Sequence, residues 1–194
     1  LGSFLRAFTF GHVRQLDAVA SRFLIALAGL TGLLRASGGP VASGTDTVVD
    51  RGYALLDVDD TIIEVHGHAK QGAGFGYSGV RGLNALLATL TSATSASVVV
   101  AQRLRKGSTA SPRGAKRLVG DAVRTARRLL DKAHPVLVRM DSAFYGRGPV
   151  HAALAGGAAV SVTVRMDKRV KAAIAAISED AWTTIEYTDA VFDE

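Results

Sequence analysis

The feature that most constrains the fold is a pair of apolar segments that each end in acidic residues. Residues 55–63 read LLDVDDTII, and residues 135–142 read PVLVRMDS. Both segments have the length and the β-branched content of buried strands. A carboxylate at the tip of such a strand must be paired, hydrogen-bonded or bound to a cation, because an isolated charge is costly near an apolar core. The two segments therefore predict a sheet whose acidic ends carry a functional site.

The spacing of the acidic residues predicts which of them act together. Side chains two positions apart share one face of a strand, so Asp57 and Asp59 are expected to point one way and Asp60 the other. Asp141 is expected beside them if the two strands are neighbours in the sheet. Carboxylate oxygens are the ligands that Mg²⁺ prefers, and carboxylates can hold two ions about 3.5–4 Å apart for phosphoryl transfer. We therefore predict that Asp59 and Asp141 bind Mg²⁺, with Mn²⁺ as a substitute, and that Asp60 has a structural role.

The remaining pattern predicts an α/β fold with a mixed sheet. A helical segment comes first, and the elements that follow have the order β-β-β-α-β-α-β, which is the strand order of ribonuclease H-like cores. The three leading strands are expected to form an antiparallel meander, with a Gly-rich loop over residues 67–82. Helices are predicted at residues 12–34, 112–133, 150–154 and 168–177, and strands at 53–65, 83–91, 97–104, 136–140, 158–165 and 182–187.

The organisation along the chain predicts three parts. Residues 1–50 are expected to form an N-terminal helical segment and loop, 51–178 an incomplete ribonuclease H-like catalytic core, and 179–194 the start of an insertion region. The apolar stretch from residue 23 to 34 is too short to cross a bilayer and predicts a buried helix, so no membrane partner is expected. The chain starts without Met and stops in mid-pattern, which suggests a fragment.

The charge distribution predicts a polyanionic partner. The net charge is +6, and the segment from residue 103 to 132 holds ten Lys and Arg against two Asp. Basic side chains at this density neutralise phosphates without reading sequence, so we expect double-stranded DNA as the partner. The absence of cysteine suits a reducing compartment and a cytoplasmic location. The candidate DNA-binding residues are Arg103, Arg105, Lys106, Arg113, Lys116, Arg117, Arg124, Arg127 and Arg128.

Four segments together resemble the DDE transposases of bacterial insertion sequences, in the group with an Asp-x-Thr first motif. They are LGSFLRAFTFGHVRQLDAV, LLDVDDTIIEVHG, FGYSGVRGLNALLATL and VLVRMDSAFYG. The resemblance implies a ribonuclease H-like fold, Mg²⁺ dependence, and cleavage and joining of DNA at the ends of the element. By position, the catalytic residues would be Asp59 and Asp141, with Asp57 and Thr61 as candidates for supporting them.

The chain departs from the family in one respect, and alternatives stay open. The family's third acidic residue is a Glu within a Tyr…Arg…Glu…Lys pattern, and this sequence lacks that pattern. The isolated fragment is therefore expected to be inactive. The first motif also fits haloacid-dehalogenase-like phosphatases, with Asp57 as nucleophile and Asp59 as general acid/base. A catalytically dead DNA-binding remnant is a further alternative, and self-association on DNA is a further expectation for the partners.

Overall fold

The computed structural model describes residues 10–31, 52–67, 69–92 and 95–184, which fall into two compact units, Leu1–Thr163 and Val164–Glu194. Our division of the chain at residues 50 and 178 stays a prediction. The first unit holds α2 (Phe10–Leu30), β1 (Ala54–Glu64), β2 (Gly74–Phe75), β3 (Arg81–Ser92), β4 (Ser95–Lys106), α3 (Ala115–Leu129), β5 (Val136–Met140), the 3-10 helix η1 (Ser142–Phe144), α4 (Arg147–Ala155) and β6 (Ala159–Val162). The second holds α5 (Lys168–Ala175) and the 3-10 helix η2 (Glu179–Ala181).

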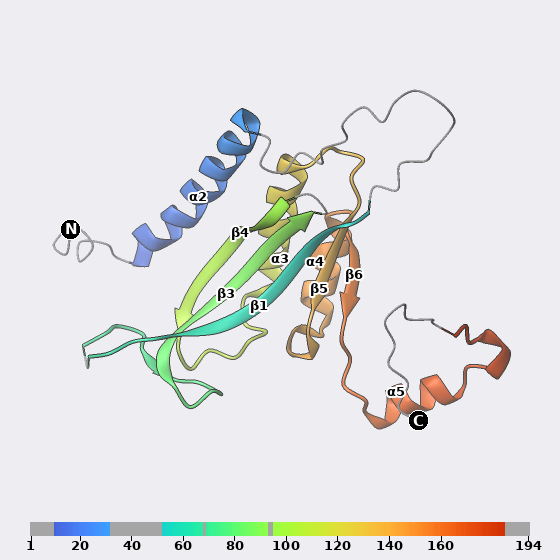
Figure 1. Cartoon of the computed structure of the whole chain (residues 1–194). Helices are drawn as coiled ribbons and strands as arrows, with labels where there is room; N and C mark the ends of the chain where they lie inside the picture. Colours follow the sequence, from blue (N-terminus) through green and yellow to red (C-terminus); the bar gives the residue numbers. More distant parts are fainter. Residues whose placement is uncertain (1–9, 32–51, 68, 93–94, 185–194) are drawn as a thin grey trace, which may run out of the picture. The chain divides into compact units, whose positions relative to one another are not determined.

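A six-stranded mixed sheet forms the centre of the first unit, and β1 lies in its middle (Figure 1). β3 pairs antiparallel with β1 on one side, and β4 pairs antiparallel with β3. On the other side β5 runs parallel to β1, and β6 runs parallel to β5. The antiparallel meander and the parallel strands reached through helices confirm the predicted ribonuclease H-like α/β fold.

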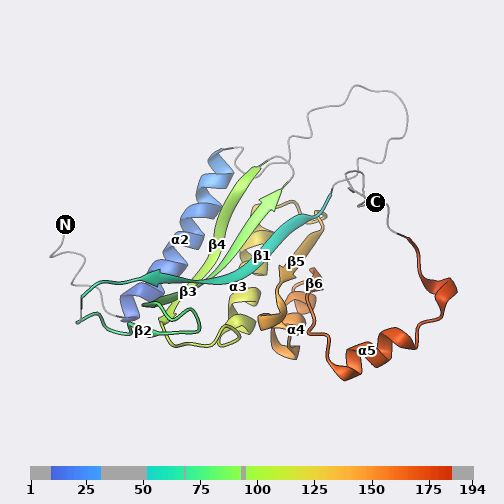
Figure 2. The ribbon, with the colours of Figure 1, turned by 60° about the horizontal axis from the view of Figure 1, so that its bottom comes forward.

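The core lies between one face of this sheet and the helices α3 and α4 (Figure 2). Leu56 and Val58 of β1 are buried on this face together with Val136 and Val138 of β5. Alternate residues of these strands point to the opposite face. One face of β1 is thus fixed by apolar packing, and its other face is left for polar groups.

Helix α3 supplies the main apolar surface on that side. Its buried residues recur at helical spacing, and its Arg and Lys residues fall mostly on the outer side, as the sequence pattern predicted. The helix is shorter than predicted at both ends. Gly114 adopts a left-handed conformation with φ of 84° before the first turn, and Leu130 is extended after the last one. Neither conformation continues an α-helix.

The Gly-rich stretch is more ordered than the loop that we predicted. It contains β2, which pairs with the start of β3. A Cβ atom on Gly107 would lie 2.0 Å from the Gly82 carbonyl oxygen and 2.3 Å from the Gly74 carbonyl oxygen. Only glycine allows three backbone segments to approach this closely. The glycines therefore let three segments of main chain pack closely at the end of β4, and we call this site the glycine junction.

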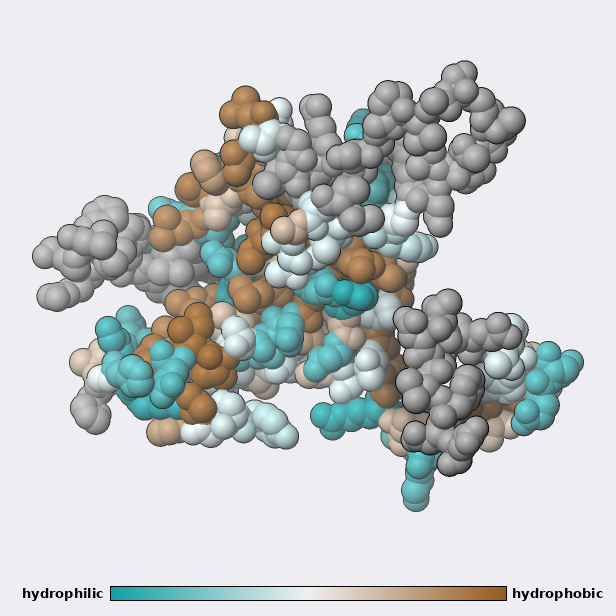
Figure 3. Space-filling model, viewed as in Figure 1, coloured by the Kyte–Doolittle hydropathy of each residue, from teal (hydrophilic) through white to brown (hydrophobic). Residues whose placement is uncertain are grey.

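The prediction of a buried helix is wrong for part of its surface over residues 23–31, and residues 32–34 lie outside the described residues. α2 packs against β4 and α3, and Leu24 contacts the core. Leu16, Val19, Phe23 and Leu30 are exposed instead, and Figure 3 shows apolar surface along this helix. The reason is that α2 lies beside the sheet and touches it along one side only. No helix in the described part of the chain is both long and apolar enough to cross a membrane.

Two further differences concern the strands near residue 160 and beyond. β6 stops at Val162, three residues before the predicted end, and among the described residues its partner strand is β5. Residues 182–184 form no strand, and the rest of the predicted strand over 182–187 lies outside the described residues. Both predictions relied on β-branched content, which does not ensure a pairing partner.

Truncation of a buried leucine tests the assigned core. Leu118 of α3 is fully buried, whereas Leu154 of α4 is 58% exposed. We expect Leu118→Ala to lower the free energy of unfolding by about 2–5 kcal/mol, because it leaves a cavity as well as removing apolar contacts. Leu154→Ala is the matched control and should change it by less than about 0.5 kcal/mol. Urea denaturation followed by circular dichroism measures both, and equal effects would contradict the assigned core.

Candidate active site

Asp59 lies on β1, and Asp141 directly follows the last residue of the neighbouring strand β5. The parallel register pairs Asp57 with Arg139 and Val58 with Met140, so continuing it by one residue places Asp141 beside Asp59. Adjacent strands lie about 4.8 Å apart. Both Asp59 and Asp141 are exposed, and strand alternation puts them on the face opposite the helix-covered core. The register of β1 and β5 therefore indicates that these two acidic residues, far apart in the sequence, lie near each other.

The hydrogen bonds of the two carboxylates leave one oxygen of each available. The Asp60 backbone N–H donates to Oδ1 of Asp59 at 2.8 Å, and the Ala143 N–H donates to Oδ1 of Asp141 at 2.9 Å. Asp141 is also the residue that caps η1. Within the described ranges, Oδ2 of either carboxylate has no hydrogen-bond partner. Two exposed carboxylate oxygens with fixed neighbours suit the hard-oxygen coordination that Mg²⁺ and Mn²⁺ take.

The described residues do not provide a complete cage for an ion. No group of three or more His, Cys, Asp or Glu among them is arranged to hold a metal. Thr61 lies two residues beyond Asp59 on the same face of β1 and is exposed. The donor set therefore consists of two carboxylates with a hydroxyl further along the strand.

Asp57 is engaged by an arginine that the sequence reasoning missed. Arg139 of β5 donates from Nε to Oδ1 of Asp57 at 2.6 Å and from Nη2 to Oδ2 at 2.8 Å. This forked contact raises the pKa of the Arg139 guanidinium, first through the hydrogen bonds and then through the carboxylate charge. The sequence did offer one signal for Arg139: it lies two residues before Asp141, so its side chain is expected on the same face of the strand. Both Asp57 oxygens are thus occupied, next to the Asp59–Asp141 pair.

Asp60 points to the other side of the sheet, as predicted, and lies in a polar network. Its Oδ2 accepts hydrogen bonds from Asn84 at 2.5 Å, from Arg105 at 2.9 Å and from the Ser111 hydroxyl at 3.2 Å. Arg105 also donates to the Asn84 side-chain oxygen. Asn84 was missed by sequence reasoning, although its place among the alternate buried residues of β3 marks it as a polar group in need of partners.

The Asp60–Arg105 pair is largely removed from water. The side chains are 15% and 8% exposed, respectively. Burial lowers the pKa of the Arg105 guanidinium, and the attraction of Asp60 offsets part of this effect. Removing one partner of a buried ion pair costs about 3–5 kcal/mol, because the other charge is left without compensation. Arg105, one of the predicted DNA-binding residues, therefore has internal partners.

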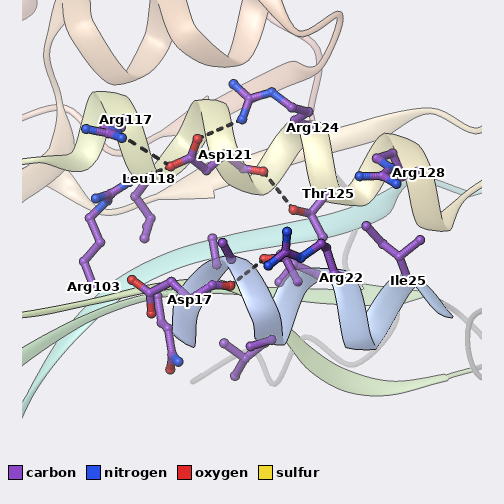
Figure 4. A pocket seen from close by; sticks show the side chains of 17 residues that line it. Asp17, Arg22, Ile25, Arg103, Arg117, Leu118, Asp121, Arg124, Thr125 and Arg128 are labelled. Atoms are coloured by element: carbon purple, nitrogen blue, oxygen red, sulfur yellow. Dashed lines mark hydrogen bonds and ion pairs between the residues drawn. The ribbon is translucent and has the colours of Figure 1, made fainter. Parts of the chain in front are cut away.

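The predicted basic residues separate into two groups. Arg117, Arg124 and Arg128 are exposed on α3 and line a cleft of about 460 Å³ between α2, β4 and α3 (Figure 4). Arg22 of α2 lines the same cleft and was not identified from the sequence. Asp121 lies within this group and forms ion pairs with Arg103 at 2.5 Å and Arg124 at 2.8 Å.

The other predicted basic residues lie elsewhere. Arg127 donates to the carbonyl oxygens of His134 at 2.7 Å and Gly157 at 2.5 Å, which ties α3 to the loops around it. Lys106, Arg113 and Lys116 are exposed near the end of β4 and the start of α3. The basic segment is therefore partly a surface and partly a set of internal ties.

Comparison with known proteins identifies the family. The family model described as a transposase DDE domain matches residues 40–189. A piggyBac transposase, solved by cryo-EM in a synaptic complex with hairpin DNA, is 14% identical with a TM-score of 0.41. That likeness covers 65% of this chain, which spans about a quarter (26%) of the piggyBac chain. Among curated proteins, none is significantly similar in sequence to this chain.

The match to the family model extends over most of the sequence, so the chain belongs to the DDE transposase family. Its antiparallel β1–β3 pair also differs from the strand–helix alternation on which the phosphatase alternative depends. The resemblance read from the sequence motifs is thereby confirmed at the level of the family.

Both oxygens of Asp57 are hydrogen-bonded to Arg139, so Asp57 is not expected to bind the metal together with Asp59 and Asp141. We expect Asp57→Asn to weaken the ion pair and to leave Mn²⁺ binding within about twofold of the unaltered chain, because Oδ2 of Asp59 and of Asp141 is unaffected. Mn²⁺-induced relaxation of water protons measures the affinity. A loss as large as that of Asp59→Asn would show that Asp57 is itself a ligand.

Proposed function

We propose that this chain provides two metal-binding carboxylates, Asp59 and Asp141, to a DNA transposase that cuts and joins DNA at the ends of an insertion sequence. The observation that supports the proposal best is the parallel register of β1 and β5 in a domain of the DDE family, because its continuation by one residue would pair Asp59 with Asp141. Strand alternation puts Asp59 on the face of the sheet opposite the core, and both residues are exposed.

The residues of the chain have distinct tasks in this proposal. Asp59 and Asp141 present one oxygen each, while the Asp60 and Ala143 N–H groups hold the other oxygen in place. A bound Mg²⁺ or Mn²⁺ would supply activation of a water or hydroxyl nucleophile and stabilisation of the leaving oxygen. Arg139 is kept beside the carboxylates by Asp57, and it adds positive charge where a phosphate would approach.

A further carboxylate is needed for the full reaction in this proposal. The described residues offer no group of three or more acidic or His ligands, so in this proposal the additional acidic group comes from a part of the protein outside them. Binding of DNA without cleavage is therefore the expected property of this chain by itself. An inactive remnant of a transposase would also bind DNA without cleaving it. The two cases would differ in whether the complete gene product cleaves DNA.

The surface proposed for DNA contact is the exposed basic group of α3. Arg117, Arg124 and Arg128 lie on the outer side of this helix, and Arg22 faces them across the cleft in Figure 4. Guanidinium groups bind phosphates through paired hydrogen bonds as well as charge. The internal ties of Arg105 and Arg127 make these two residues less available, so they are not part of the proposed surface.

Substitution of the carboxylates tests the proposed chemistry. In the protein encoded by the complete reading frame, Asp59→Asn or Asp141→Asn should reduce Mg²⁺-dependent nicking of DNA carrying the element ends by at least about a thousandfold, since an amide is a weak metal ligand. DNA affinity measured in EDTA should change little. Normal nicking by either variant would contradict the assignment.

Charge removal on α3 tests the proposed DNA surface. We expect Arg117→Gln with Arg128→Gln to weaken binding to duplex DNA of any sequence. The negative slope of log affinity against log salt should also become shallower by about one to two, because fewer counterions are released. Lys168→Gln with Lys171→Gln on α5 is the matched control and should leave the slope unchanged. Fluorescence anisotropy across a salt series measures this, and equal slopes for all variants would reject the surface.

A further inference from the structure

The polar network around Asp60 lies directly beside the candidate metal ligand Asp59. The two residues are consecutive, and their side chains project to opposite faces of β1. The only described hydrogen bond to the Asp59 carboxylate comes from the Asp60 backbone N–H, at 2.8 Å. The orientation of one peptide group therefore connects the network on the core side with the carboxylate on the open side.

At this point β1 is paired on one side only, with β3. β5 pairs with β1 only as far as Val58, opposite Met140, so from Asp59 onward β3 is the strand described beside it. A peptide at the point where a strand loses one neighbour has more freedom than a peptide paired on both sides. The side chain of Asp60 compensates, because three donors from other elements hold its Oδ2.

Arg105 is the centre of this network. Besides Asp60 and Asn84, its guanidinium donates to the backbone oxygens of Ser111 at 2.9 Å and Arg113 at 2.6 Å. These bonds join β1, β3 and β4 to the turn before α3. A planar guanidinium with several fixed donors can hold this arrangement, whereas an ammonium group cannot reproduce its fork.

We propose that Arg105 is a positioning residue for metal binding, which acts through Asp60 to orient the Asp59 carboxylate. The inference rests on the proposed function of Asp59 as a metal ligand. Arg105 fixes the Asp60 side chain, the fixed Asp60 peptide directs its N–H to Oδ1 of Asp59, and Oδ2 is left without a described hydrogen-bond partner. Partners that orient a metal ligand typically change affinity 10–100-fold when they are altered.

Mn²⁺ affinity of Arg105→Lys tests the proposal. The variant keeps the positive charge but loses the fork, and we expect its Mn²⁺ dissociation constant to rise about tenfold. Arg103→Lys is the matched control, since Arg103 lies two residues earlier on β4 and is ion-paired with Asp121 instead. The control should bind Mn²⁺ as the unaltered chain does, and circular dichroism verifies that both variants are folded.

A second measurement separates orientation from general destabilisation. In the ¹H–¹⁵N spectrum of Arg105→Lys, the Asp60 amide should shift and exchange faster with solvent, because its hydrogen bond to Asp59 is weakened. The Ala143 amide, which donates to Asp141, should keep its position and exchange rate. A merely structural role of Arg105 would alter both amides or neither.

The outcomes are distinguishable. Equal Mn²⁺ affinities for Arg105→Lys and Arg103→Lys would overturn the role of Arg105 while leaving the metal site intact. If Asp59→Asn and the unaltered chain bind Mn²⁺ equally, the proposed function itself fails. If Arg105→Lys does not fold, Ser111→Ala decides, since it removes one donor to Asp60. A smaller but measurable loss of Mn²⁺ affinity then supports the proposal, and unchanged affinity rejects it.

Discussion

The structure depends on the two unlike faces of β1. Leu56 and Val58 are held in the core by α3, and this packing fixes which residues of the same strand must point away from it. Asp57 and Asp59 take the open face because a shift by one residue would bury them. The position of the acidic residues is thus decided by the apolar residues between them. A strand with the same acids and weaker apolar alternation would not specify the site.

Much of the fold could be predicted because its signals are local. The period-two pattern of β1 and the helical spacing of Leu118, Val119 and Ala122 each lie within one element, and the order of the elements allows few sheet arrangements. The expectation that Asp59 and Asp141 lie side by side followed from strand order for the same reason. The end of β6 and the exposed side of α2 depended on which neighbours were present, and no local pattern records that.

The partners of charged residues were the least predictable part of the site. A run of basic residues around α3 suggested one DNA-binding surface, yet Arg105 is buried against Asp60, and Arg127 holds backbone oxygens. The distinction requires knowing which side of β4 or α3 faces the core at each position. Arg139 was missed because its partner Asp57 is distant in sequence. Charge density alone cannot separate a guanidinium that meets solvent from one that ties elements together.

The glycine junction at the end of β4 has a consequence for how this region can vary. Gly107 approaches the carbonyl oxygens of Gly74 and Gly82, and Gly82 in turn lies against Ile63 of β1. Four stretches of main chain therefore approach one another closely at this point, and the Ile62 side chain packs against one of them. Alanine is excluded at Gly82 and Gly107 alike, and relieving one clash leaves the next in place. In a mutational library, tolerated sequences here should come from replacing the whole junction together, rather than from accumulating single changes.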